Sequence, residues 1–221
     1  DPAPITESVE YQEASWDGSQ VTYESKTENC TAVESSTEAV TWDAGWYAVS
    51  GTVTIDQPIT VTGAVNLILG DGCTLNAEKG IVVTTDNSLT IYAQTGGSGT
   101  LTATGTVDSD NNASAGIGGS TASLDSGAIT IHGGVINATG GSTGSSGHGG
   151  AGIGGSTTSY QNGGSSGAII IYDGTVTANS GAGELTGAGI GGGGSGQQNG
   201  GDGNDITIYG GSVTAASTAT N

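Results

Sequence analysis

The 221-residue chain is rich in glycine and strongly acidic, with 44 glycines, 21 acidic residues and only two basic ones. A net charge of −19 without a single arginine leaves no surface that could bind phosphates, which excludes a nucleic-acid partner. No apolar run approaches the ~20 residues of a membrane-spanning helix, so we expect no membrane insertion.

Residues 1–45 predict an acidic N-terminal arm followed by a β-hairpin. An Asp-Gly turn at 17–18 separates two runs of alternating residues, which is typical of a hairpin. Because a stack of coils needs a polar cap against end-to-end strand pairing, we assign this segment to an N-terminal β cap. Trp42, Trp46 and Tyr47 are expected to cover the first coil, and a sugar-binding platform is the alternative for these aromatics.

The stretch 50–105 predicts short, regular coils of β-strand. β-branched strings such as TVTI, ITVT, NLIL and LTIY follow one another, separated by turn sequences such as DQP and GDG.

A repeat of 36 to 37 residues is visible in the second half of the chain. Three copies of Ala-Gly-Ile-Gly-Gly are centred on Ile117, Ile153 and Ile190. After each copy follow two further strings of the type ITIY and VTA, divided by Gly-Gly or Asp-Gly. The positions that correspond in these strings are Ile91, Ile131, Ile171 and Ile208, and then Leu101, Ile136, Val176 and Val213.

These strings alternate apolar with small polar residues, which predicts strands with one buried face. Each is too short to bury a core alone, whereas stacked repeats bury their apolar positions as columns. The sequence therefore predicts an all-β fold, a parallel β-helix (solenoid) over 46–221 with repeats of 36–40 residues. Gly/Ser loops at 139–150, 156–166 and 191–203 are expected to project from its corners.

The sequence of residues 42–221 resembles glycine-rich repeat segments of secreted surface proteins from anaerobic Gram-positive bacteria. The resemblance is carried by WYAVSGTVTIDQPITVTGAVNLILGDGCTLNAEKGIVV, then LTIYAQ, then AGIGG alternating with ITIYGG and VTA. It implies a right-handed β-helix, a location at the cell surface or outside the cell, and an adhesin-like or carbohydrate-binding role. It supplies no catalytic residues.

One aromatic side chain closes the ITIY string of each repeat. Because the isoleucines point inward, these side chains point outward and should stack on one another about 4.8 Å apart. Such an aromatic ladder either packs for stability or binds a polysaccharide along its ring edges. Its members are Tyr92, His132, Tyr172 and Tyr209.

Two acidic loops resemble calcium-binding sequences in part. Asp108, Asp110 and Asn112 stand at alternate positions, as at the start of an EF-hand loop, but no glycine follows at position six and no glutamate at position twelve. Asp202 and Asp205 lie in a loop like one nonapeptide of a Ca²⁺-binding β-roll. We expect no cofactor, with a structural Ca²⁺ at one of these loops as the alternative.

Cys30 and Cys73 are the only cysteines. In a chain placed outside the cell an even number predicts one disulfide, which here would tie the cap to an early coil and contribute roughly 3–4 kcal/mol. Two unrelated thiols or a bridge between molecules are the alternatives.

The sequence favours a non-catalytic protein. A β-helical polysaccharide lyase is expected to use arginine or lysine as its base, but arginine is absent and Lys79 is expected at a turn between two strands rather than in a cleft. The acids that a glycosidase would need lie on different corners. We expect a structural or adhesive module of the cell surface that associates end to end, as a homo-oligomer or filament. The alternative is a carbohydrate-binding module whose partner is a polysaccharide on the aromatic ladder.

Overall fold

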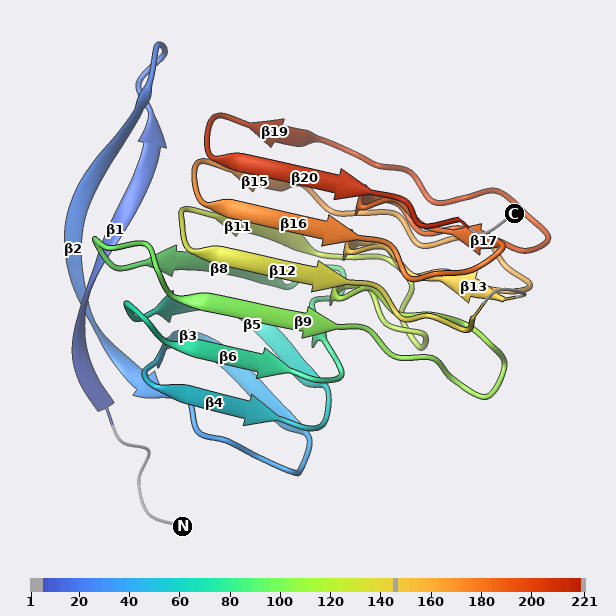
Figure 1. Cartoon of the computed structure of the whole chain (residues 1–221), viewed down its shortest axis with the longest axis horizontal. Coiled ribbons are helices and arrows are strands. Elements are labelled where there is room, and N and C mark those ends of the chain that lie inside the picture. The colour runs from blue at the N-terminus through green and yellow to red at the C-terminus, as the bar shows by residue number, and fades with distance from the viewer. Residues whose placement is uncertain (1–5, 145–146, 220–221) are drawn as a thin grey trace.

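A computed structural model describes residues 6–144 and 147–219. The chain is all-β, as predicted, with 20 strands and no helix in this part. Accordingly, none of the described residues forms a helix that could cross a membrane. Figure 1 shows a stack of coils whose strands run across the stack, with a long hairpin standing along one side.

The largest sheet contains twelve strands in the order β18-β14-β10-β7-β5-β3-β2-β1-β8-β11-β15-β19. Their bounds are β1 (Thr6–Trp16), β2 (Val21–Ala32), β3 (Val40–Val49), β5 (Ile59–Leu69), β7 (Ile81–Val82), β8 (Ser88–Ala93), β10 (Ile117–Gly118), β11 (Ala128–Ile131), β14 (Ile153–Gly154), β15 (Ile169–Ile171), β18 (Ile190–Gly191) and β19 (Ile206–Ile208).

A second, six-stranded sheet carries one strand from each coil in the order β20-β16-β12-β9-β6-β4, and β13 pairs with β17 at the loop edge. The bounds are β4 (Thr52–Ile55), β6 (Thr74–Ala77), β9 (Thr100–Thr104), β12 (Val135–Thr139), β16 (Thr175–Asn179), β20 (Ser212–Ala216), β13 (His148–Gly149) and β17 (Leu185–Thr186).

The register of the parallel strands is the one that the repeats predict. Ile131 lies beside Ile91 and Ile171, and Ile136 beside Leu101 and Val176. All of these side chains are fully buried, so each repeat position forms a column of aliphatic side chains through the stack. Stacked coils thus build one continuous core that no single repeat could form.

The lower coils are more compact than the upper ones. The long strand β5 pairs with β7 near Ile59 and with β8 from Ala64 onward, so it fills the place that two separate strands occupy in later coils. Two of the Gly/Ser loops, 156–166 and 191–203, lie where the upper coils divide this strand in two, whereas the loop 139–150 follows β12 at another corner.

Glycine allows the coils to approach at the Ala-Gly-Ile-Gly-Gly corner. Gly118, Gly154 and Gly191 stack with φ values of +134°, +131° and +134°. A Cβ atom on Gly118 would lie 2.1 Å from the Gly154 carbonyl oxygen. Both the backbone conformation and the lack of space require glycine here.

The predicted hairpin forms, but it does not cap the end of the stack. β1 and β2 pair without interruption from Thr6–Thr31 to Trp16–Val21, and they run along the side of the coils (Figure 1). Of the aromatics expected to cover the first coil, Trp42 is 2% exposed in the main core and Tyr47 packs against that core, whereas Trp46 packs against a separate cluster beneath the hairpin. β3 also crosses the predicted boundary at 45/46, because it pairs with β5 from Val40 onward.

The hairpin closes a ring of five strands, β5-β3-β2-β1-β8, and this ring encloses a second apolar cluster. Successive residues of β5 face opposite ways, so Leu67 lies in the main core and Ile68 in the second cluster. Tyr11 and Cys30 enter that cluster from the hairpin, and Tyr92 enters it from β8. The two cores therefore share the strands between them.

We predict that Ile131→Ala lowers the free energy of unfolding by about 2–5 kcal/mol, because it opens a cavity in the aliphatic column. Thr130→Ala, the half-buried neighbour on the same strand, should cost about 1 kcal/mol or less. Urea denaturation followed by circular dichroism measures both. Equal losses of unfolding free energy in the two variants would contradict the assignment of Ile131 to the core and Thr130 to the outer face.

Candidate functional site

The aromatic ladder runs along the ends of β8, β11, β15 and β19. Ring centroids lie 4.6 Å apart between Tyr92 and His132, 4.9 Å between His132 and Tyr172, and 5.1 Å between Tyr172 and Tyr209. The interplanar angles are only 6°, 12° and 14°. The predicted stacking is thus confirmed. The distance between rings follows from the spacing of the neighbouring parallel strands.

Other rings extend the ladder at both ends. Trp46 stacks below Tyr92 at 5.3 Å, and Trp16 from the hairpin stacks above Tyr209 at 5.4 Å. Tyr11, also from the hairpin, meets the edge of Tyr92 at 4.7 Å. The hairpin therefore contributes a ring near each end of the stack.

The hairpin covers the middle of the ladder. Tyr92 is 6% exposed and His132 9%, whereas Tyr209 is 37% exposed. His132 Nδ1 donates a hydrogen bond of 2.7 Å to the Ala14 carbonyl oxygen of β1. In this arrangement a polysaccharide could lie along the whole ladder only by displacing the hairpin, and the ligand-binding role of the four rings stays a prediction.

Burial changes the proton affinity of the covered rings. Desolvation lowers the pKa of His132 below its ordinary value, although the hydrogen bond to Ala14 and the charge of Glu13 act in the opposite direction. Burial also raises the pKa of Tyr92 to about 12. Both rings are therefore neutral at pH 7, and no charge is buried where they stack on each other.

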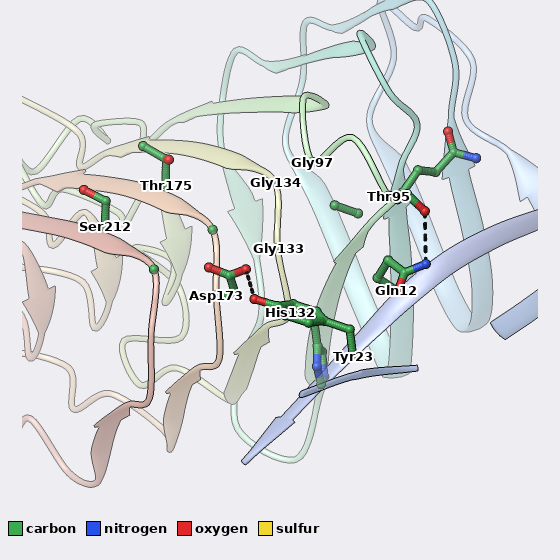
Figure 2. A pocket seen from close by; sticks show the side chains of 14 residues that line it. Gln12, Tyr23, Thr95, Gly97, His132, Gly133, Gly134, Asp173, Thr175 and Ser212 are labelled. Carbon is green, nitrogen blue, oxygen red and sulfur yellow. Dashed lines mark hydrogen bonds between the residues drawn. The ribbon is translucent and has the colours of Figure 1, made fainter. Parts of the chain in front are cut away.

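A groove lies beside the ladder, between the hairpin and the turns that join the two large sheets. Its volume is about 530 Å³, within the range of ordinary ligand sites. Two hydrogen bonds tie the hairpin to the coils across it: Gln12 Nε2 donates to Thr95 Oγ1 at 3.1 Å, and the Tyr23 hydroxyl donates to Asp173 Oδ2. Figure 2 shows both bonds and the glycine turns between them.

Sequence reasoning missed this groove. Gln12 and Tyr23 belong to the hairpin, and 83 and 150 residues separate them from their partners Thr95 and Asp173. Only the row of turn sequences, such as Gly133-Gly134 and Asp173-Gly174, marks its floor in the sequence. The hydrogen bond to Asp173 also raises the pKa of Tyr23 to about 12.

In the first predicted calcium loop, the carboxylate of Asp108 accepts hydrogen bonds from its own loop. Asp108 Oδ1 accepts from the backbone N–H of Asp110 and Asn112, and Oδ2 accepts from Asn112 Nδ2. Although burial alone would raise it, these bonds hold the pKa of Asp108 below its usual value. Asp202 and Asp205 are exposed. Within 6–144 and 147–219 no three acidic, His or Cys side chains gather as a metal site.

The predicted disulfide is wrong for this structure, because Cys30 and Cys73 are both free and buried. Cys30 lies in the cluster beneath the hairpin, whereas Cys73 lies in the main core. The sequence could not show that strands of the ring stand between them. Burial raises the pKa of Cys30 to about 11, so this thiol is unreactive at neutral pH.

The comparison with protein families identifies the repeats. A family model described as a beta helix repeat matches residues 95–121, 169–194 and 206–217. The chain contains β-helix repeats. The matched segments contain β9 and β10, then β15 to β18, and then β19 and β20, whereas β11 to β14 lie outside them. No curated protein and no solved structure matches the chain.

We predict that the β-helix loses stability as the pH falls from 7.5 to 5.5. The unfolded histidine binds a proton near pH 6.5, whereas folded His132 binds one only at lower pH, so acid favours the unfolded state. Urea denaturation at both pH values measures the difference. Because phenylalanine cannot titrate, His132→Phe should flatten this slope; an unchanged slope would remove His132 as its source.

The thiols give a second prediction, on the packing of both clusters. Iodoacetamide at pH 7.5 should modify neither Cys30 nor Cys73 in the folded protein, since both are buried. In denaturant without any reductant, mass spectrometry should find two modified residues. If the denatured protein stays unmodified, Cys30 and Cys73 form a disulfide after all.

Proposed function

We propose that this chain is a non-catalytic structural or adhesive module of the bacterial cell surface, located outside the cell. The observation that carries the proposal is the continuous stack, in which the six-stranded sheet links all coils through in-register parallel pairing. Such a stack is a rigid spacer with a regular surface. The absence of arginine and the acidic charge of −19 further favour a solvated surface over lyase chemistry.

The resemblance to secreted Gram-positive surface proteins supports this location, and it supports a right-handed coil. Handedness has a physical basis as well, because crossover connections between parallel strands are right-handed in about 98% of cases. We therefore propose a right-handed β-helix as the scaffold.

We further propose that the module associates end to end through its uppermost described coil. Ile206 and Ile208 occupy the same column positions as Ile169 and Ile171, which are fully buried, yet they are 39% and 51% exposed. The edges of β18, β19 and β20 likewise carry no further strand among the described residues. A second copy of the chain fits this surface, because another coil would continue both the strand pairing and the aliphatic column.

The alternative, a carbohydrate-binding module that uses the ladder, requires the hairpin to move. Tyr172 and Tyr209 are less deeply covered than Tyr92 and His132, so the upper end of the ladder is the part most open to a ligand. The scaffold role needs no such movement, and we favour it.

We predict that the purified chain forms rods or filaments by electron microscopy and concentration-dependent oligomers by light scattering. Ile208→Lys should leave it monomeric, because the charge enters the apolar end surface. Thr207→Lys, the adjacent half-buried position, adds the same charge on the outward side and should still assemble.

A chain that stays monomeric at all concentrations removes the self-association. Equal effects of the two lysines would show that general charge, and not the aliphatic end surface, controls assembly.

A further inference from the structure

The two ends of the stack differ in the strand edges that they leave free. At the lower end, the segment that joins β2 to β3 pairs with the outer edge of β4 (Figure 1). Ser36 N–H donates to the Thr54 carbonyl oxygen at 3.0 Å, and the Ser36 carbonyl oxygen accepts from Asp56 N–H at 2.9 Å. Thr54 N–H donates to Ser35 Oγ at 3.0 Å. The lower edge of the six-stranded sheet is therefore already occupied by the chain itself.

The end of β2 occupies the neighbouring edge of β3. Thr31 and Ala32 pair in parallel with Tyr47 and Ala48, and Val33 N–H then donates to the Ala48 carbonyl oxygen at 2.9 Å. Val33 is only 7% exposed and belongs to the main core. A second molecule could therefore pair with these edges only by displacing a packed segment of the same chain.

The upper end carries backbone groups that point away from the stack. Ser212 N–H and the Ala216 carbonyl oxygen both form hydrogen bonds with the coil below, so the even-numbered residues of β20 face β16. Successive residues of a strand direct their backbone groups to opposite edges. The N–H and C=O groups of Val213 and Ala215 therefore face outward, and within 6–144 and 147–219 β20 pairs with no strand but β16.

The alternation of these groups determines how a second copy can pair. In an antiparallel pair, residues opposite each other either both direct their backbone groups across the interface or both direct them away. Centring the pair on Thr214, the middle residue of β20, satisfies this rule along the whole strand. Val213 then lies opposite the partner's Ala215, so every outward N–H and C=O group of these residues finds an acceptor or a donor.

The same arrangement covers the exposed end of the aliphatic column. Val213 lies beside Val176 and packs against the main core, whereas Ile206 and Ile208 are 39% and 51% exposed. A two-fold axis perpendicular to the sheets places the interior of one stack over the interior of the other, so the apolar side chains of the two ends cover each other. An interface of this isologous kind is complete with two copies.

The tip of the hairpin favours pairing of two upper ends over continuous stacking. Trp16 stacks on Tyr209 at 5.4 Å, on the face opposite Tyr172, which is the place that the ring of a following coil would take. Antiparallel pairing reverses the strand direction in the second copy. The partner's aromatic ladder then lies at the other end of the strands, where no ring competes with Trp16 for this place.

We propose that two copies of the chain join through their upper ends about a two-fold axis, with β20 of each copy paired antiparallel to β20 of the other. The inference rests on the self-association proposed above and specifies its geometry. The product is a short rod of two stacks whose lower ends both face outward. It does not elongate, because β4 is already paired at each outer end.

Cysteine trapping tests the two-fold axis. With Cys30 and Cys73 replaced by alanine, Thr214→Cys should form a disulfide-linked dimer under mild oxidation, because the axis brings the Cα atoms of this non-hydrogen-bonded pair to about 4.5 Å. Thr177→Cys, at the corresponding position one coil below, is the matched control. It should stay reduced, since three strand spacings, about 14 Å, would separate its thiols.

A mixture of Thr214→Cys and Thr54→Cys chains tests the head-to-tail arrangement. Thr54 lies between the buried Val53 and Ile55 on β4, so it is the outward position that a continuous stack would bring to β20 of another copy. We expect no mixed dimer, and light scattering of the unmodified chain should rise to the mass of two chains and no further. Mixed dimers or larger masses overturn the two-fold geometry but leave the self-association standing, whereas monomers at every concentration overturn both.

A proline variant tests the role of the β20 edge. Ala215→Pro removes an N–H group that points away from the stack, so the β-helix should keep its thermal stability. Dimerisation should weaken about tenfold or more, because the interface loses backbone hydrogen bonds. Ala215→Ser keeps the N–H group and is the matched control, with dimerisation unchanged. Undiminished dimerisation of Ala215→Pro would place the interface elsewhere and overturn the proposal.

Discussion

The spacing between neighbouring parallel strands governs the whole molecule. Because each coil stands one strand spacing above the last, every residue meets its own counterpart in the next repeat: isoleucine on isoleucine, glycine on glycine, ring on ring. A residue type is therefore tolerated at a position only if it can pack against the same residue type in the next coil. Ile131 satisfies this by burial, Gly118 by having no side chain, and Tyr172 by lying flat against its neighbours.

The hairpin runs along the side of the stack, across the direction of the coil strands. It crosses several coils and covers the ladder, so rings that would face water become the interior of a second cluster. Tyr11 and Trp16 join the ladder near its two ends, and Ala14 binds His132 between them. The groove follows from the same arrangement, because a straight hairpin that contacts the coils at Thr95 and Asp173 leaves the glycine turns between them uncovered.

The repeats made much of the fold predictable. The alignment of Ile91, Ile131 and Ile171, and the stacking of the outward rings, follow from periodicity because each repeat must pair with the next. The hairpin could be predicted as a hairpin from its own turn, but its place could not, since Tyr11 and Trp16 have no counterpart in any repeat. The disulfide was inferred from cysteine number alone, and a count carries no information on which cluster each thiol enters. The groove depends on contacts between distant segments, which no local pattern encodes.

Register is the central claim, and disulfide trapping measures it most directly. With Cys30 and Cys73 replaced by alanine, Asn137→Cys paired with Thr177→Cys puts two thiols on directly adjacent residues of β12 and β16. This pair should oxidise readily, because adjacent strands bring the Cα atoms to about 4.8 Å. Asn137→Cys with Thr175→Cys is offset by two residues, to about 8 Å, and should stay reduced. Efficient bonding of the offset pair, with none in the adjacent one, would contradict the stack described here.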